Sequence, residues 1–368
     1  MNKKVINFFS GSKRPRQFRF ATKLKVLCDE LDINYELIEN NNFQRLKNKI
    51  KTNLQGFRSI KIDDDENLGI LHQTLNKGKM NYYAEIDLPF GIHNFNINIQ
   101  RNNYRKAKEI LIKDNLKGII TFSNWAKRNF GLHFGEEIEK KCITIYPLPY
   151  NNNFNLDLNK KRKYDFVFVS KSFITKGGRE VIYAFSKLLK NKNQNLKLLC
   201  ITDLNEAKKS LGNLNIFKNI DWIESNLSEK EVNNYLMNSR CLVHPTLSDS
   251  FGVVILEAMS VGCAIIASDI ATIPELINKK NAFAIKAPTC TVVGDSYILE
   301  YGNTTYHKKY LKTLDLYRLE NQILEYMILF TEDENNARKM MSESLKITKN
   351  KFSDEIWKRK IKKLITTN

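Results

Sequence analysis

The chain has 368 residues, of which 42% are hydrophobic and 11% aromatic, so a mostly disordered polypeptide is excluded and two domains are expected. Its 59 Lys and Arg residues against 40 Asp and Glu give a formal net charge of +19. A basic surface attracts nucleic acid, anionic lipid or phosphorylated ligands, so the charge alone does not select a partner.

Cysteine usage and the N-terminal sequence favour a cytoplasmic protein. The six cysteines lie far apart without any C-x-x-C pair, which predicts reduced thiols and neither disulfides nor a zinc site. No apolar run reaches the roughly 18 residues of a membrane-spanning helix. The start of the chain lacks the small-residue cleavage site of a secretion signal. A peripheral position on the inner face of a membrane stays open.

The first half of the chain shows an irregular alternation of short apolar strands and helices. Helices are predicted over 17–30 and 103–114. The predicted strands are 3–9, 33–38, 57–62, 81–88, 118–122 and 142–148. A polar segment without periodicity follows Pro149 and predicts a linker near residue 155.

The alternation is clearest from residue 164 onward. The predicted strands are 164–169, 196–201, 241–245 and 263–268, with helices of about 10–15 residues between them. Ser228 and Glu231 have the spacing of a capping box. This alternation predicts a parallel sheet with helices on both faces. The last thirty residues carry apolar side chains at helical spacing, which predicts a helix packed on the protein or, alternatively, lying on a membrane.

Two lysines directly follow the first strand of the second half. Lys171 and Lys176 lie in the sequence KSFITKGG, between strand 164–169 and a helix. Ligands of parallel sheets bind at the carboxyl ends of strands, and ammonium groups beside a helix N-terminus suit a diphosphate. The alternative interpretation is a solvated turn.

Two carboxylates frame the helix that follows strand 241–245. Gly252 allows the backbone to approach a ligand, and Asp249 stands just ahead of the helix. Glu257 lies among apolar residues, where a carboxylate needs a partner such as a pair of sugar hydroxyls. Alternatively, Asp249 is a helix cap and Glu257 bonds to neighbouring backbone. The segment 267–275 adds a Pro-started helix at the same edge.

As a set, these segments resemble the donor-binding region of retaining GT-B glycosyltransferases, in particular glycosyltransferase family 4, the group 1 glycosyl transferases. The segment HPTLSDSFGVVILEAMSVGCAIIASDIATIPELI keeps the family's two acidic residues, Asp249 and Glu257, separated by seven others. Other residues in register with the family motif are Phe251, Gly252, Ala258, Met259 and Gly262. Lys171 and Lys176 stand five apart, like the Arg and Lys that hold the donor diphosphate in the family. The resemblance covers about residues 164–286.

The resemblance implies an α/β protein of the GT-B fold, with two Rossmann-like parallel-sheet domains facing a central cleft. Residues 1–155 would form the acceptor-binding domain, and residues 156–345 would bind the nucleotide-sugar donor. A basic C-terminal helix, 346–368, would pack back towards the N-terminal domain.

The resemblance also implies roles for individual residues. Lys171 and Lys176 would neutralise the pyrophosphate during catalysis. Glu257 would hold the ribose hydroxyls, and Asp249 would face the transferred sugar. The remaining donor-side candidates are Ser170, Ser250, Phe251, Gly252 and Val253. The acceptor-side candidates are Glu85, Asp87 and His93, with a structural role as the alternative for His93.

The chain departs from the family pattern at several positions. Asp249 stands where Glu is usual, which shortens its reach by about one methylene. Lys171 replaces an Arg, which loses bidentate geometry but keeps the charge. Ser170, Cys263, Ala271 and Thr272 stand where the family often has Gly, Pro, Gly and Gly.

The expected function is the transfer of a hexose-type sugar from a nucleotide-diphosphate donor to a hydroxyl of a glycan or lipid-linked acceptor, with retention of anomeric configuration. Such a transferase would serve cell-surface polysaccharide or glycolipid synthesis. The resemblance implies neither a metal nor a cofactor, because lysines and helix N-termini neutralise the leaving group. The run Asp63–Glu66 looks like a D-x-D metal motif but is predicted to be a solvated loop.

The expected partners are the nucleotide sugar, its acceptor and an anionic membrane surface, but not nucleic acid. Residues expected to contact the membrane are Arg14, Arg16, Arg19, Lys23 and Lys25. One alternative is a catalytically silent GT-B scaffold or partner subunit. Another is a basic nucleic-acid-binding protein, although no helix-turn-helix, zinc or RNA-recognition motif is present in the sequence.

Overall fold

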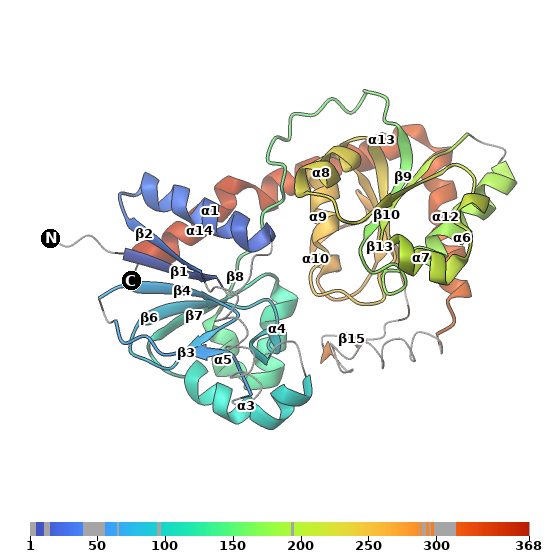
Figure 1. Cartoon of the computed structure of the whole chain (residues 1–368). Helices are drawn as coiled ribbons and strands as arrows, with labels where there is room; N and C mark the ends of the chain where they lie inside the picture. The colour runs from blue at the N-terminus through green and yellow to red at the C-terminus, as the bar shows by residue number, and fades with distance from the viewer. Residues whose placement is uncertain are drawn as a thin grey trace. The chain divides into compact units, whose positions relative to one another are not determined.

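The computed structural model describes residues 5–10, 15–39, 56–64, 66–93, 97–192, 195–286, 288, 292–293, 296–297 and 314–367. The chain divides into two compact units, each built on its own parallel sheet (Figure 1). The first unit comprises residues 1–148, 293–306 and 354–368, and the second comprises 149–292 and 307–353. The division at Leu148 and Pro149 lies earlier than the linker position predicted near residue 155.

Six parallel strands form the sheet of the first unit, in the order β2-β1-β4-β6-β7-β8. Their bounds are β1 Val5–Ser10, β2 Asn34–Glu39, β4 Leu68–His72, β6 Asn81–Glu85, β7 Leu116–Thr121 and β8 Cys142–Thr144. Strand β4 was not predicted, because Gly69 and His72 interrupt its short apolar run. The strand predicted over 57–62 shrinks to β3 (Ser59–Ile60), which lies outside the six-stranded sheet and pairs with β5 (Leu75–Asn76).

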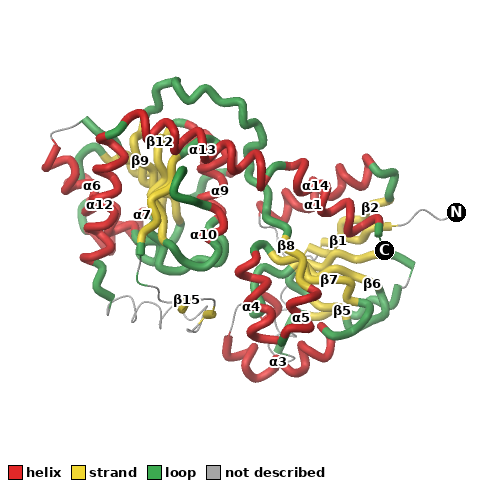
Figure 2. The backbone as a smooth tube through the Cα atoms, turned by 180° about the vertical axis from the view of Figure 1, so that it is seen from behind, coloured by secondary structure: helices red, strands yellow, loops and turns green. Residues whose placement is uncertain are grey.

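Helices cover both faces of this sheet. Helices α1 (Pro15–Glu30) and α14 (Asp354–Thr366) lie side by side on one face (Figures 1 and 2). The elements packed on the other side are α3 (Ile97–Leu111), α4 (Asn124–Phe134) and α5 (Glu136–Lys141), with a short 3-10 helix, η1 (Gly91–His93), before them. Neighbouring strand residues such as Ile70 and Leu71 belong to different apolar clusters, as the period of two in a strand requires.

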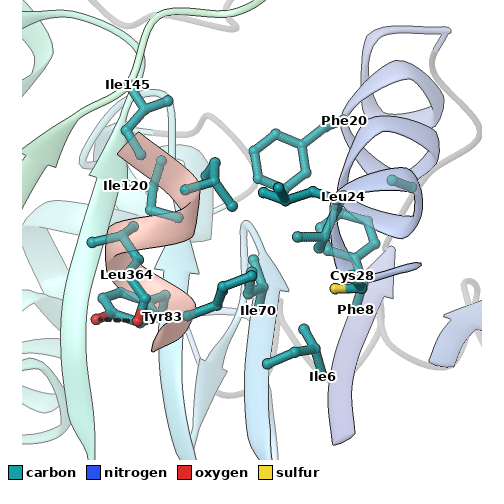
Figure 3. Close-up of a cluster of buried hydrophobic side chains, with 14 of the residues drawn as sticks. Ile6, Phe8, Phe20, Leu24, Cys28, Ile70, Tyr83, Ile120, Ile145 and Leu364 are labelled. Carbon is teal, nitrogen blue, oxygen red and sulfur yellow. Dashed lines mark hydrogen bonds between the residues drawn. The ribbon is translucent and has the colours of Figure 1, made fainter. Parts of the chain in front are cut away.

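Helix α14 is an integral part of the core of the first unit. The Trp357 ring packs edge-on against Phe20 of α1, with ring centroids 5.2 Å apart. The Tyr83 hydroxyl of β6 donates to the backbone oxygen of Leu364 at 3.3 Å, as Figure 3 shows. The apolar spacing at the end of the chain therefore reflects packing on the protein.

The single helix predicted over 346–368 is two helices in the structure. Helix α13 (Glu334–Phe352) runs past residue 346, and Ser353 interrupts it with an extended backbone. Asp354 and Glu355 then begin α14, where carboxylates favour a helix N-terminus. The apolar spacing does not reveal this break, because Phe352 and Trp357 on its two sides are both buried.

The second unit contains a six-stranded parallel sheet in the order β11-β10-β9-β12-β13-β14. Its strands are β9 Tyr164–Ser170, β10 Leu198–Thr202, β11 Ile220–Glu224, β12 Ser239–His244, β13 Ala264–Ser268 and β14 Ala282–Ile285. The four strands predicted in this half are confirmed. Strands β9, β10 and β11 follow one another towards one edge of the sheet, and β12, β13 and β14 follow one another towards the other edge. The strand order therefore reverses between the two central strands, β9 and β12.

Helices cover both faces of the second sheet as well, as predicted (Figures 1 and 2). One side carries α6 (Gly178–Lys192), α7 (Leu204–Leu211) and α12 (Tyr317–Glu332), and the other carries α8 (Glu229–Met237), α9 (Val253–Ser260) and α13. Short elements are η2 (Leu214–Ile216), α10 (Ile273–Leu276), β15 (Val292–Val293) and β16 (Ser296–Tyr297). The predicted capping box of Ser228 and Glu231 is confirmed. Within the described residues, no helix combines the length and the apolar character needed to cross a membrane.

Candidate functional site

Three loops of the second unit emerge at the same edge of its sheet. They follow the carboxyl ends of β9, β12 and β13, which are adjacent strands. The strand order reverses between β9 and β12, and ligands of open parallel sheets bind at such a switch point. The loops 171–177 and 245–252 flank this point, and each leads into a helix, α6 or α9.

The first two loops pack closely against each other. The Leu247 amide donates to the Thr175 carbonyl at 3.0 Å. Gly177 has a φ of +72°, and a Cβ there would lie 2.5 Å from the Pro245 carbonyl oxygen. Only glycine fits this position, which explains the first glycine of the KGG sequence.

An ion pair joins the two loops. Lys176 Nζ donates to Asp249 Oδ2 at 2.7 Å and also to the Ser248 carbonyl oxygen. Both charged side chains are largely buried, with exposed fractions of 18% and 16%. Burial alone would raise the pKa of Asp249, but the Lys176 charge and a hydrogen bond from His244 hold it well below its usual range. Asp249 is therefore ionised at neutral pH.

His244, the last residue of β12, was not among the predicted site residues. Its side chain is only 2% exposed, and Nε2 lies 3.3 Å from Asp249 Oδ2. Burial lowers the pKa of His244, which favours the neutral ring. Its place at the carboxyl end of a predicted strand, five residues before Asp249, is the sequence signal that marks it.

Asp249 also binds the turn that leads into helix α9, although the helix itself has no side-chain cap. Its Oδ1 atom accepts hydrogen bonds from the amides of Phe251 at 3.2 Å and Gly252 at 2.9 Å. Gly252 is left-handed, with a φ of +79°, which lets the chain turn into the helix. Phe251 and Val253 are both buried, so their side chains are not exposed to a ligand in this structure.

Two other expected donor-side residues, Lys171 and Glu257, lie on the first loop and on helix α9. Lys171 is exposed at the start of the first loop, next to Ser170, whose hydroxyl accepts from the Ser172 amide at 3.1 Å. Glu257 lies in the second turn of α9, and its Oε2 atom accepts from the Tyr150 amide at 2.7 Å. The structure thus places Lys176 and Asp249 in direct contact and gives Glu257 a backbone partner distant in sequence.

The third loop carries two of the departures from the family pattern. Ala271 has a φ of +52°, in the left-handed region that favours glycine. The Thr272 side chain is buried, and its hydroxyl donates to the Ser250 carbonyl at 2.8 Å. Thr272 therefore supports the loop that contains the candidate residue Ser250.

In the first unit, two acceptor-side candidates belong to a polar cluster beside the switch point of that sheet. Glu85, at the end of β6, places Oε2 2.9 Å from Nδ1 of His72, at the end of β4, and both are buried. Gln73 Nε2 donates to Asp87 Oδ1 at 2.6 Å. The sequence pattern missed His72 and Gln73 because it missed β4, the strand adjacent to β1 where the strand order reverses.

The hydrogen bond of His93 is made to a residue outside this cluster. The His93 ring is fully buried, and Nδ1 donates to the Gly56 carbonyl oxygen at 2.5 Å. Burial lowers the pKa of His93 to about 4, although the Gly56 contact opposes the shift. These contacts favour the structural role that the sequence left as an alternative.

The acidic run near residue 64 has the contacts of a turn. The Asp64 carboxylate accepts from the amides of Glu66 and Asn67, each at 3.1 Å. Asp63 pairs with Lys61 at 3.2 Å on the surface, and Asp65 lies outside the described residues. In the part of the chain that the structure describes, no three His, Cys, Asp or Glu side chains are grouped so as to hold a metal ion.

Two Rossmann-like units with parallel sheets define the GT-B fold, and solved structures of glycosyltransferases share this arrangement. Residues 151–296 match the family model described as glycosyl transferases group 1. No curated protein matches the chain. The two parallel-sheet units and the similar solved structures confirm the predicted GT-B fold class.

Three solved structures illustrate the similarity. HepE of Anabaena, in complex with UDP and glucose, is 12% identical with a TM-score of 0.62, over 99% of this chain and 100% of that one. Sucrose-phosphate synthase from Thermosynechococcus elongatus is 12% identical with a TM-score of 0.64, over 99% of both chains. WaaG, a glycosyltransferase involved in lipopolysaccharide biosynthesis, is 13% identical with a TM-score of 0.57, over 99% of this chain and 100% of that one.

Proposed function

We propose that the protein is a glycosyltransferase that binds a nucleoside-diphosphate sugar at the loop edge of the second unit. The observation that carries this proposal is the contact between Lys176 and Asp249 at the switch point, within the segment matched by the family model. The complexes of HepE with UDP and with UDP-glucose support a nucleotide sugar as the donor.

The donor would be held by charge at one end and by hydroxyl recognition at the other. Lys171, Lys176 and the N-terminus of α6 would neutralise the diphosphate. Glu257 would accept hydrogen bonds from the ribose hydroxyls, because a carboxylate can bind a pair of hydroxyls at once. Asp249 would lie where the transferred sugar meets the diphosphate.

The proposed reaction retains the anomeric configuration. The bond between the sugar C1 and the diphosphate oxygen breaks, and an acceptor hydroxyl oxygen bonds to C1 on the same face. The hydroxyl proton passes to the departing phosphate oxygen, and the nucleoside diphosphate is released. The protein contributes positioning and cationic stabilisation of the developing charge, so the reaction needs no metal ion.

The acceptor would bind to the first unit. Glu85 and Asp87, with their partners His72 and Gln73, provide carboxylate and amide groups at the carboxyl ends of β4 and β6. Such groups recognise the hydroxyls of a glycan or a lipid-linked sugar. The described role of WaaG in lipopolysaccharide biosynthesis supports a cell-surface glycan or glycolipid as the product.

A cytoplasmic protein of this kind would meet a lipid-linked acceptor at an anionic membrane surface. Of the five basic residues expected there, Arg19 donates to the Leu148 carbonyl and Lys23 pairs with Asp354, whereas Lys25 is exposed. Arg14 and the side chain of Arg16 lie outside the described part of the chain. Exposed basic residues on the adjacent helix α14 are Arg359, Lys362 and Lys363. Reversal of these charges together with Lys25 should abolish sedimentation with anionic vesicles, and unchanged sedimentation would exclude this contact.

A donor screen tests the proposed activity. The protein is incubated with UDP-, GDP-, ADP- and dTDP-sugars and a mixture of glycan acceptors, and release of nucleoside diphosphate is measured with and without a metal chelator. We expect release from one donor class, unaffected by the chelator, and a product whose anomeric configuration by NMR equals that of the donor. Absence of both release and donor binding would reject the proposal.

A catalytically silent GT-B scaffold is the second candidate. The left-handed Ala271 and the buried Thr272, where the family often has glycines, favour it because they crowd the backbone at the donor edge. In that case calorimetry should detect no binding of any nucleotide sugar.

A further inference from the structure

The Asp249 carboxylate is surrounded by donors from three elements. Its Oδ1 atom accepts the amides of Phe251 and Gly252 at 3.2 and 2.9 Å. Its Oδ2 atom lies 2.7 Å from Lys176 Nζ and 3.3 Å from His244 Nε2. A carboxylate has about four lone-pair sites, so the protein itself occupies the hydrogen-bonding capacity of Asp249. A sugar hydroxyl could bind Asp249 only by displacing one of these donors.

The same geometry determines the tautomer of His244. An ionised carboxylate can only accept, so the hydrogen bond to Asp249 requires the proton on Nε2. The opposite nitrogen, Nδ1, is buried without a hydrogen-bond partner in the described structure. A proton on Nδ1 would be an unsatisfied buried donor, which is costly. The charged groups that face His244 are Asp249 and Lys176, and the latter disfavours a second positive charge.

The ammonium group of Lys176 is held in place by two of its hydrogen-bond donors. An ammonium group has three N–H donors. Two of them bond to the Ser248 carbonyl and the Asp249 carboxylate. In the described residues no third partner of Lys176 Nζ is present, so one donor is available to a phosphate oxygen. Because Asp249 is itself held by His244 and by the amides of Phe251 and Gly252, the position of Lys176 depends on all of these contacts.

We propose that His244 is a positioning residue for the donor diphosphate, acting through Asp249 on Lys176. The inference rests on the proposed donor site and revises the role of Asp249 within it. Asp249 holds the lysine that meets the diphosphate, and its contact with the transferred sugar is secondary. Pre-positioning of this ammonium group matters most when negative charge develops on the departing diphosphate, since no side chain then has to reorganise.

Substitution of His244 with two different side chains separates positioning from packing. His244→Leu keeps an apolar volume but removes the Nε2 donor, whereas His244→Gln places an amide donor near the same position. Cys241→Ala, on the same strand, is the matched control because Cys241 is also a fully buried side chain of β12. All variants are compared by circular dichroism and thermal unfolding before binding is measured.

Calorimetry with UDP, GDP and ADP gives the first readout. We expect His244→Leu to weaken binding of the preferred nucleotide about tenfold, the effect of one charge-assisted hydrogen bond. His244→Gln should recover most of this loss, and Cys241→Ala should bind like the wild type. If the wild type binds none of these nucleotides or their sugars, the proposed function fails. If the wild type binds and His244→Leu binds equally well, or His244→Gln does not recover binding, only the present inference fails.

Turnover gives the second readout. A folded His244→Leu variant should show a kcat about tenfold lower, with an unchanged KM for the acceptor, because Lys176 stabilises the leaving group and not the acceptor. An unchanged kcat would overturn the inference.

The wild-type protein provides a readout that needs no variant. Nitrogen-15 NMR of the ring nitrogens at pH 7 should show one histidine as a neutral Nε2–H tautomer whose signals disappear in His244→Leu. The five histidines of the chain make this assignment tractable. An Nδ1–H tautomer or an imidazolium at His244 would overturn the inference.

Discussion

Lys176 and Asp249 are 73 residues apart in sequence, yet Nζ of the lysine lies 2.7 Å from Oδ2 of the aspartate. They meet because β9 and β12 are neighbours in the sheet although β10 and β11 separate them along the chain. Removing one partner of a buried pair leaves the other charge uncompensated, which costs more than the pair contributes. Both residues are therefore expected to be sensitive to substitution.

Substitution of Lys176 should abolish most transferase activity. Lys176→Met removes a cation from the developing diphosphate charge, and we expect kcat to fall about 100-fold, as for loss of one pre-organised donor. The control is Lys163→Met, which removes an exposed lysine at the opposite end of β9, where it pairs with Asp221. A Lys176→Met enzyme with the wild-type rate would contradict the assigned role.

Glu257 should determine the preference for ribose over deoxyribose. Glu257→Gln retains an oxygen that can accept from the Tyr150 amide but loses the charge that binds hydroxyl pairs. We expect the wild type to bind a ribonucleoside diphosphate about tenfold more tightly than its 2′-deoxy counterpart, and the variant to lose this preference. The deoxy ligand is the internal control, and an unchanged preference in the variant would place the ribose elsewhere.

Because of His93, the protein should be less stable in mild acid than at neutral pH. Burial lowers the pKa of His93 to about 4, so between pH 6.5 and 4 the unfolded chain binds a proton that the folded chain does not. The free energy of unfolding should therefore decrease as the pH falls through this range, by about 3 kcal/mol from this group.

The comparison with His93→Asn isolates this contribution. The Asn amide can donate to the Gly56 carbonyl as His93 Nδ1 does, but it does not titrate. Urea unfolding at pH 7.5 and pH 4 should show a smaller loss of stability for the variant. Equal losses would show that His93 does not titrate as its burial requires.

Trp357 should be essential to the stability of the first unit. It is 3% exposed and packs on Phe20, so Trp357→Ala leaves a cavity and should lower the free energy of unfolding by about 3–5 kcal/mol. Ile216→Ala is the control, because that side chain is 65% exposed. If thermal unfolding of the two variants is equally close to the wild type, α14 does not contribute to this core.

Ala271 is strained, and glycine should relieve the strain. An L-residue in the left-handed region costs about 1–2 kcal/mol, and the greater flexibility of unfolded glycine offsets about half of that. Ala271→Gly should therefore stabilise the second unit by about 0.5–1 kcal/mol. Ala207→Gly, in the ordinary helix α7, should have the opposite sign. Destabilisation by both substitutions, measured by urea unfolding, would contradict this interpretation.

Four strands of the second unit were easier to predict than those of the first, because their apolar runs are not interrupted by glycine or polar residues. Strands β9, β10, β12 and β13 each contain an uninterrupted apolar run of three or four residues, with clear helices between them. In the first unit, β4 contains Gly69 and His72, and without β4 the cluster of His72, Gln73, Glu85 and Asp87 is not apparent. The four predicted strands of the second unit could therefore be read from the sequence, whereas His72 and Gln73 of the polar cluster in the first unit could not.

The sequence by itself determined the βαβ alternation and the residue types at the sheet edge, because these depend on local periodicity and motif spacing, and its resemblance to a known family indicated the GT-B fold. Only the tertiary structure decided that His244 and Lys176 converge on one carboxylate, and that the chain breaks at Ser353 so that α14 joins the first unit. Such contacts depend on which strands are neighbours and on how buried polar groups are satisfied, and neither is encoded in the spacing of residues along the chain.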